Sequence, residues 1–392
     1  SKILWLLISL VTNLGMLGTF KYFNFFADNV ASVATMLGLS MDPIVLNVVL
    51  PVGISFYTFQ TLSYTIDIYR GLLKPRRSFI DFALFVAFFP QLVAGPIERA
   101  TRFLPQVERR RRFRLVLVTD AIPLLVRGYF KKLVVADNVA VYVNQIYGLE
   151  SPSLLLLSVG SVGFAIQILA DFSAYTDIAR GSARLLGFDL IKNFNRPYVA
   201  ITPSDFWRRW HISFSTWIRD YVYIPLGGSR VKTLTASVAV LIATMAISGL
   251  WHGAAWHFVA WGIYHGILLA AYRLVGFGSR WTPSSLTGHA TAVGVMFTFT
   301  IFGWSLFRTD ELPWLMNVLA SGRIVGTNAE LLGATVVGIL YALYCGLWLA
   351  DDALTTFTPN WRFANVLVKY AMVAAVLLFG AEEQIEFIYF QF

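Results

Sequence analysis

Apolar runs long enough to cross a lipid bilayer constrain this chain more than any other feature of its sequence. A spanning helix needs about 20 mainly apolar residues to cross about 30 Å of hydrocarbon. Runs that approach or exceed this length occupy residues 3–20, 79–94, 115–135, 154–170, 231–250, 290–307, 331–350 and 364–380. Charged residues make up only 14% of the chain, whereas a soluble domain carries about 25%. We therefore predict an all-α polytopic transmembrane protein with about nine or ten membrane segments, plus interfacial or re-entrant helices.

The basic residues are clustered, and the clusters predict how the chain is oriented. Residues 70–132 hold fourteen of the 31 Lys and Arg residues, and residues 180–232 hold nine. An excess of basic residues in short loops marks the cytoplasmic side of a membrane protein. The four arginines at 109–112 are expected to contact lipid phosphates and to fix the topology. No nucleic-acid partner is expected, although the net charge is +9.

Two apolar stretches carry polar residues that need an explanation. Residues 44–69 are interrupted by Pro51 and Gly53, and such breaks are tolerated only where protein covers the backbone or a wet cavity adjoins it. This stretch is expected to line a cavity or to re-enter the membrane. Further along, Asp177 and Arg180 are three residues apart and are expected to pair on a helix; direct chemistry at Asp177 is the alternative.

Residues 202–266 are the most unusual part of the chain. They contain four of the five histidines and six of the twelve tryptophans. Titratable groups at membrane depth are costly and usually mark a functional site. The alternative is that these histidines only cap helices and hold them together.

The first half of this region predicts one short helix from Thr202 to Trp217, with Thr202 as its cap. Its length of about 23 Å is short for a membrane span, which favours the interface or a cytoplasmic cavity. One face of the helix carries Trp207, His211, Phe214 and Ser215. An aromatic wall edged by arginines suits an acyl carrier that bears phosphates. The residues expected to contact this donor are Trp207, Arg208, Arg209, Trp217, Arg219, Asp220, Trp251 and Trp256.

The second half predicts a helix on which Trp256, Val259 and Ile263 share a face with His252. On that helix, His257, Trp261 and His265 point the opposite way. A metal site needs convergent ligands, so no metal site is expected. Burial keeps an imidazole neutral and able to accept a proton, and a hydroxyl that attacks a thioester needs such a base. His252 and His211 are therefore the candidate catalytic residues.

Several separated motifs resemble the membrane-bound O-acyltransferase (MBOAT) family, in particular its bacterial alginate and polysaccharide O-acetylation branch. They are Phe206-Trp-Arg-Arg-Trp-His-Ile-Ser-Phe-Ser, Arg219-Asp-Tyr and Leu250-Trp-His-Gly, with further similar stretches at 50–57, 89–97 and 171–179. The resemblance implies one integral membrane domain over 1–392, with a catalytic core at about 171–275. It also implies a ring of helices that form a funnel around a central site, where His252 matches the catalytic histidine of the family and His211 a second conserved histidine.

The resemblance further implies an acetyltransferase in a bacterial cytoplasmic (inner) membrane. The donor would be acetyl-CoA, used as a substrate, with no permanently bound cofactor. The immediate acceptor would be a periplasmic serine-hydrolase-like acetyltransferase that serves the polysaccharide machinery. The alternatives are an O-acyltransferase with another donor or acceptor, such as a lipid, a protein or teichoic acid, and a proton-coupled transporter.

Overall fold

The computed structural model describes residues 2–112, 114–277, 281–381 and 385–388, and every regular element within these residues is a helix. The α-helices, in chain order, are α1 Lys2–Leu17, α2 Phe23–Met36, α3 Ile54–Tyr69, α4 Phe79–Val86, α5 Ala100–Glu108, α6 Leu115–Phe130, α7 Asp137–Tyr147, α8 Leu154–Leu185, α9 Pro203–Arg209, α10 Ile212–Ile218, α11 Leu234–His252, α12 Trp256–Leu274, α13 Leu286–Arg308, α14 Leu312–Ala320, α15 Asn328–Phe357 and α16 Arg362–Phe379. Shorter π and 3₁₀ elements are η1 Gly18–Tyr22, η2 Lys131–Ala136, η3 Pro197–Val199, η4 Arg219–Tyr223 and η5 Gly228–Arg230.

Within the described residues, six helical stretches are long and apolar enough to cross a membrane. These are Lys2–Met36, Leu154–Leu185, Leu234–His252, Leu286–Arg308, Asn328–Phe357 and Arg362–Phe379. They confirm the predicted all-α polytopic membrane fold, while the total of nine or ten segments stays a prediction. The first stretch is longer than expected because α1 continues through the π-helical turn η1 into α2.

The span predicted at 79–94 is wrong. The helix α4 contains only eight residues, which correspond to about 12 Å. The chain leaves the helix at Ala87, three residues before Pro90. Proline inside a helix removes a backbone hydrogen bond, and the residue before a proline disfavours the helical conformation, so the helix does not continue through this position.

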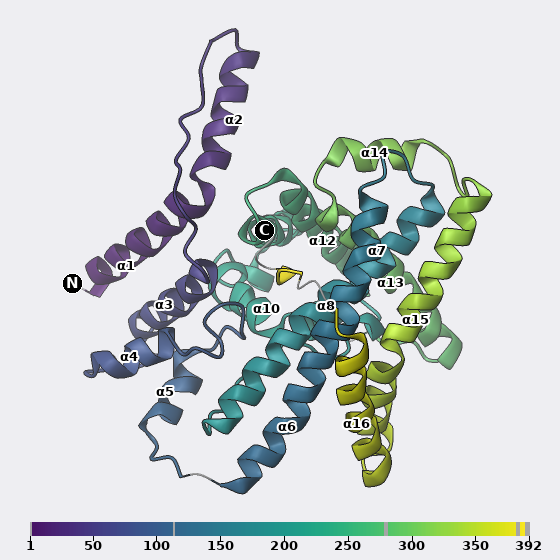
Figure 1. Ribbon diagram of the computed structural model, residues 1–392. Coiled ribbons are helices and arrows are strands. Elements are labelled where there is room, and N and C mark those ends of the chain that lie inside the picture. The colour runs from purple at the N-terminus through teal and green to yellow at the C-terminus, as the bar shows by residue number, and fades with distance from the viewer. Residues whose placement is uncertain (1, 113, 278–280, 382–384, 389–392) are drawn as a thin grey trace.

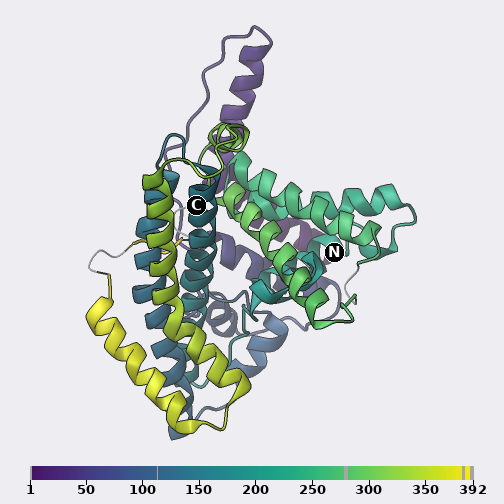
Figure 2. The ribbon, with the colours of Figure 1, turned by 90° about the vertical axis from the view of Figure 1, so that its right-hand side faces the viewer.

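The helices form two groups that meet at α13. In the first group, α8 packs against α6, α7 and α15, and α16 packs against α6 and α15. In the second group, α11 and α12 pair, and α12 also packs against α13, which in turn contacts α8. Figure 2 shows the first group upright on the left and the second group crossing on the right. The short helix α10 lies between them and the N-terminal helices (Figure 1).

The end of the chain returns into the core beside α8. The backbone N–H of Ile388 donates to the Asp171 carboxylate at 2.7 Å, and the Phe387 ring lies 5.1 Å from that of Tyr175. The Lys132 ammonium donates to the carbonyl oxygen of Ile385 at 2.9 Å. Residues 389–392, the remainder of the aromatic C-terminus, lie outside the described residues.

Glycines allow α11 and α12 to touch backbone to backbone. A Cβ atom on Gly262 would overlap the carbonyl oxygen of Met245, and one on Gly249 would overlap that of Phe258. Small residues at such contacts are the usual means by which membrane helices approach closely. The position of the C-terminal end of α11 is therefore fixed by its contact with α12.

We predict that Gly262→Ala pushes α11 and α12 apart. Overpacking a tight contact costs about 1–3 kcal/mol, so the midpoint of thermal unfolding in detergent should fall. The control is Gly294→Ala on α13, where a Cβ atom meets nothing within 4 Å. Equal behaviour of the two variants would contradict the proposed role of the contact.

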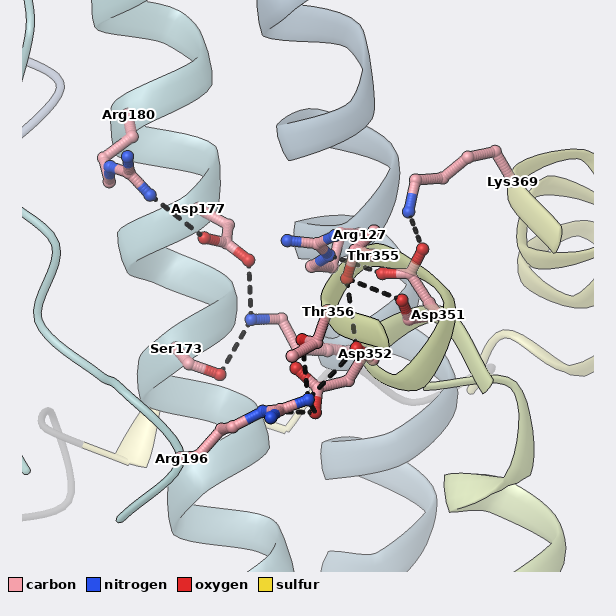
Figure 3. Close-up of polar contacts among 11 residues, drawn as sticks. Arg127, Ser173, Asp177, Arg180, Arg196, Asp351, Asp352, Thr355, Thr356 and Lys369 are labelled. Carbon is pink, nitrogen blue, oxygen red and sulfur yellow. Dashed lines mark hydrogen bonds and ion pairs between the residues drawn. The ribbon is translucent and has the colours of Figure 1, made fainter. Parts of the chain in front are cut away.

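A buried carboxylate links α6, α15 and α16. Asp351 is fully buried and accepts from the Arg127 guanidinium at 2.7 Å, and it also pairs with Lys369. Figure 3 shows both cations converging on this carboxylate. A buried charge is tolerated only when it is paired in this way.

We predict that Asp351→Asn destabilises the protein by about 3–5 kcal/mol, because two cations then face an uncharged amide. The matched control is Asp352→Asn at the next position, where the side chain is 46% exposed and the expected loss is no more than about 1 kcal/mol. Unfolding midpoints of both variants in the same detergent measure the difference. The assignment fails if the Asp351 variant is as stable as its control.

Candidate active site

His252 is the last residue of α11 and lies in an aromatic enclosure. It is only 6% exposed. Its ring centroid lies 4.9 Å from that of Trp251, 5.2 Å from Trp261, 5.3 Å from Phe307 and 5.5 Å from Phe214. These rings come from α10, α11, α12 and α13, so the two helix groups and the short helix meet at this imidazole.

His211 lies between α9 and α10 in a backbone conformation that is rare for its residue type. Its φ angle is +41°, in the left-handed region that non-glycine residues seldom occupy. The side chain is fully buried and packs edge-on against Phe172 of α8, with centroids 4.6 Å apart. Strained residues of this kind persist only where the surroundings hold them, and they cluster at functional sites.

The two candidate histidines are brought together by shared aromatic neighbours. The ring of Phe214 lies 5.0 Å from that of His211 and 5.5 Å from that of His252. Trp251 stacks on Phe214 at 4.4 Å and lies 6.2 Å from His211. Burial, followed by the nearby His252, holds the pKa of His211 well below its usual value, which favours the neutral imidazole at physiological pH.

Lys21 is a site residue that the sequence analysis missed. Its ammonium donates to the backbone carbonyl oxygens of Trp251 at 2.8 Å and of His252 at 2.9 Å. The last carbonyl groups of a helix have no partner within the helix, and a cation there is favourable. Lys21 is the only Lys or Arg between Lys2 and Arg70. A lone cation inside an apolar run is by itself a signal of function.

A cavity of about 520 Å³ adjoins the C-terminal end of α11. It is lined by Phe20, Lys21, Leu50, Gly253, Ala254, Ala255, His257, Phe258, Arg308 and Asp310. The presence of Leu50 agrees with the expectation that residues 44–69 line a cavity. Leu50 ends a stretch, residues 39–50, that has no regular structure. This stretch is joined to α2 at Leu46, where the Asn24 side chain pairs with the backbone N–H and C=O at 2.9 and 3.1 Å.

The prediction of one helix over 202–217 is wrong at its centre. Thr202 does cap the helix, with its hydroxyl accepting from the N–H of Asp205 at 3.1 Å. However, α9 ends at Arg209 and α10 begins at Ile212. As a result, Trp207 does not share a wall with His211, because its ring packs on Trp261 and His265 at 5.7 and 5.2 Å.

The predicted continuous helix around His252 is wrong for the same reason. Residues 253–255 separate α11 from α12, so helical phase does not carry across them. Trp256 is 59% exposed and donates its indole N–H to Asn29 at 2.9 Å, and it does not stack with His252. His257, which was expected to face away from the site, lines the cavity beside it.

The remaining donor candidates are Trp217, which joins the aromatic stack, and residues that form ion pairs. Trp217 is buried against Phe59, with ring centroids 3.9 Å apart, and its indole N–H donates to the Phe59 carbonyl at 3.0 Å. Phe59 also stacks on Trp251 at 5.2 Å, which connects Trp217 to the histidines. The arginines form ion pairs: Arg208 and Arg209 with Asp205 at 3.5 and 3.0 Å, and Arg219 and Arg99 with Asp220 at 2.8 and 3.2 Å. Contact of these residues with a donor stays a prediction.

Among the described residues, no three His, Cys, Asp or Glu side chains are grouped so that they could hold a metal ion. The chemistry that the site offers is that of imidazoles in an apolar aromatic enclosure. Such an enclosure disfavours charge on an imidazole and excludes bulk water. The arrangement therefore suits proton transfer by a neutral base.

Comparison with known proteins identifies the family. The sequence profile described as MBOAT, membrane-bound O-acyltransferase family, matches residues 72–309. The chain belongs to this family. The matched range includes His211, His252 and the aromatic residues around them. The protein is thus a multi-pass membrane O-acyltransferase.

Its relatives include enzymes that are named for different acceptors. The chain is 35% identical to the probable alginate O-acetylase of Pseudomonas putida, over 99% of this chain and 84% of the relative. It is 36% identical to the peptidoglycan O-acetyltransferase of Helicobacter pylori, over 83% of this chain and 66% of the relative. A more distant relative is the teichoic acid D-alanyltransferase of Bacillus subtilis, 27% identical over 67% of this chain and 69% of the relative.

We predict that Lys21→Met lowers transferase activity by about tenfold or more, because the carbonyl groups at the end of α11 lose charge-assisted hydrogen bonds worth about 1.5–3 kcal/mol. Lys21→Arg should retain part of the activity. Lys232→Met, which alters an exposed lysine just before α11, is the control. Initial rates of acyl transfer by the purified variants measure the effect. Wild-type activity in the Lys21→Met variant would show that this contact does not position His252.

Proposed function

We propose that this protein is an O-acetyltransferase of the bacterial cytoplasmic membrane. It takes acetyl groups from acetyl-CoA in the cytoplasm and passes them across the membrane toward an alginate-like polysaccharide outside the cytoplasm. The immediate acceptor is a hydroxyl of a periplasmic serine-hydrolase-like acetyltransferase. The names of the alginate and peptidoglycan relatives support a polysaccharide as the final acceptor.

The observation that carries the proposal is the position of His252 between two different environments. Helix α11 begins at Leu234, directly after the basic region 180–232, and ends at His252 beside the cavity. Trp251 of the aromatic stack lies 4.9 Å from the imidazole, and Gly253, the residue that follows His252, lines the cavity. This arrangement supports access of the donor from the basic, cytoplasmic side and of the acceptor through the cavity.

In the proposed reaction, His252 is the general base. Its imidazole accepts the proton of the acceptor hydroxyl while the hydroxyl oxygen attacks the thioester carbonyl carbon. The new C–O bond forms, the C–S bond breaks, and the thiolate of coenzyme A leaves and takes up a proton. Proton transfer by a positioned base contributes about 10²–10⁴-fold to such a rate. A base kept neutral by its apolar surroundings is ready for this step.

His211 orients the donor or stabilises the charge that develops on the carbonyl oxygen. Its left-handed backbone and its packing against Phe172 and Phe214 hold the ring in one place. Preorganised groups of this kind stabilise a transition state without having to reorganise during the reaction. The role is supported by its position next to His252, since both rings contact Phe214.

A different acyl donor is the second candidate function, and one relative favours it. The similarity to the teichoic acid D-alanyltransferase of Bacillus subtilis covers 67% of this chain.

The experiment that tests the proposed donor is transfer from radiolabelled acetyl-CoA by vesicles that contain the purified protein, with and without the periplasmic partner. Transfer from acetyl-CoA supports the proposal, and transfer only from a D-alanyl donor would replace it.

We predict that His252→Ala lowers acetyl transfer by about 10²–10⁴-fold, the contribution of a general base. His211→Ala should also lower the rate. The matched control is His289→Ala, which alters an exposed histidine near the start of α13 and should leave the rate unchanged. Yield, elution volume and unfolding midpoint establish that each variant is folded. A folded His252→Ala variant with the wild-type rate would refute the assignment.

A further inference from the structure

A second and larger cavity lies away from His252. Its volume is about 1110 Å³, and residues of α6, α8, α15 and the segment around η3 line it. Along α8 it extends from Ser158 to Arg180, and along α15 from Gly338 to Phe357. At 1.5 Å per residue these distances are about 33 Å and about 29 Å, so the groove is longer than one leaflet of a hydrocarbon core about 30 Å thick.

The groove is apolar over most of its length and charged at one end. Val162, Ile166 and Leu169 of α8 line it together with Tyr341, Ala342 and Cys345 of α15. The charged end is lined by five cations and two carboxylates, namely Arg127, Lys131, Arg180, Lys192, Arg196, Asp177 and Asp352. The five positive and two negative charges leave a net charge of +3. Figure 3 shows part of this cluster.

The two carboxylates are already engaged by other cations. Asp177 accepts from the Lys131 ammonium at 2.7 Å and lies 3.9 Å from Arg180, so the predicted Asp177–Arg180 pair is present but Lys131 is the nearer partner. Asp352 pairs with Arg196 at 2.7 Å. Within the described part of the chain, the exposed side chain of Lys192 forms no salt bridge. The cluster therefore carries positive charge that its own carboxylates do not neutralise.

The location of the charge identifies the kind of anion. The cations belong to the two basic regions, 70–132 and 180–232, that are predicted to face the cytoplasm. We therefore expect this end of the groove at the level of the headgroup phosphates, where basic pockets between membrane helices bind acidic headgroups. The apolar remainder of the groove lies between α8 and α15, both long and apolar enough to cross the membrane.

We propose that this groove binds one anionic phospholipid, with its headgroup phosphate at Lys192, Arg180 and Arg196 and an acyl chain between α8 and α15. The two parts of the lipid match the two parts of the groove, because the basic end suits the phosphate and the apolar remainder suits the acyl chain. This site is separate from the proposed acetyl transfer and does not depend on it. The lipid would fill a groove that otherwise stands open along the bundle.

The test uses the purified full chain in detergent, titrated with phosphatidylglycerol or with phosphatidylcholine. Native mass spectrometry should show one tightly held phosphatidylglycerol, and the unfolding midpoint should rise more with this lipid than with phosphatidylcholine. Glycerol 1-phosphate, which has the headgroup charge but no acyl chain, should not raise the midpoint. Equal effects of both lipids, or an equal effect of glycerol 1-phosphate, would overturn the proposal.

Two matched pairs of variants examine the two ends of the groove. Lys192→Gln should weaken phosphatidylglycerol binding about fivefold, the effect of one cation near a charged lipid surface. Lys192→Arg should retain binding, and Lys232→Gln outside the groove should not affect it. Gly338→Phe should fill the apolar part and abolish the one-to-one adduct. Gly346→Phe is its control, because a Cβ atom at either glycine meets nothing within 4 Å and only Gly338 lines the groove.

The same titration distinguishes the lipid from the acyl donor. Acetyl-CoA also carries phosphates, and it would compete if the groove led to the active site. Binding of phosphatidylglycerol that is unaffected by acetyl-CoA supports the proposal. Displacement of the lipid by acetyl-CoA would overturn it and would assign the cation cluster to the donor.

Discussion

The backbone contact between α11 and α12 is the constraint on which the site depends. Because Gly249 and Gly262 leave no room for a Cβ atom, the two helices are locked in register. The chain reverses in only three residues, 253–255, and the end of α11 is buried, since His252 is 6% exposed. Its last carbonyl groups then lie where water is scarce and need a donor. The ammonium of Lys21 supplies it, and the imidazole of His252 is held at a defined position as a result.

The membrane fold could be predicted from the sequence, and the structure brings the rings of His211 and His252 to a common neighbour, Phe214, while their catalytic role stays a prediction. Apolar runs are read directly as spans, and the cap at Thr202 follows from its side chain. Periodicity failed where the backbone departs from a helix. His211 has a left-handed backbone in a segment that is hydrogen-bonded to residues 193–195, from the Asn195 N–H to Arg209 and from the Ile212 N–H to Asn193, and residues 204–210 contain no glycine or proline that would predict the break. The break after His252 has Gly253, but an isolated glycine does not by itself end a helix.

Groups that meet from distant parts of the chain could not be found by spacing. Lys131 and Asp177 are 46 residues apart, and Arg196 and Asp352 are 156 residues apart. Lys21 is different, because its isolation among apolar residues was a visible signal. The span predicted at 3–20 stops one residue before it. The π-helical turn η1 instead carries the helix past Lys21 and turns its side chain toward the end of α11.

The irregular wall of the smaller cavity has a consequence for how a large acceptor could reach His252. Helical walls open only when many cooperative hydrogen bonds break together, whereas segments with few such bonds rearrange at low free-energy cost. Residues 39–50 are held to α2 at Leu46 by a single asparagine, Asn24. This segment can therefore rearrange on the nanosecond to microsecond timescale of loops, and Leu50, its contribution to the cavity lining, would move with it. Such a movement would leave the aromatic rings around the imidazole in place, so that under the proposed function access and proton transfer would depend on different parts of the molecule.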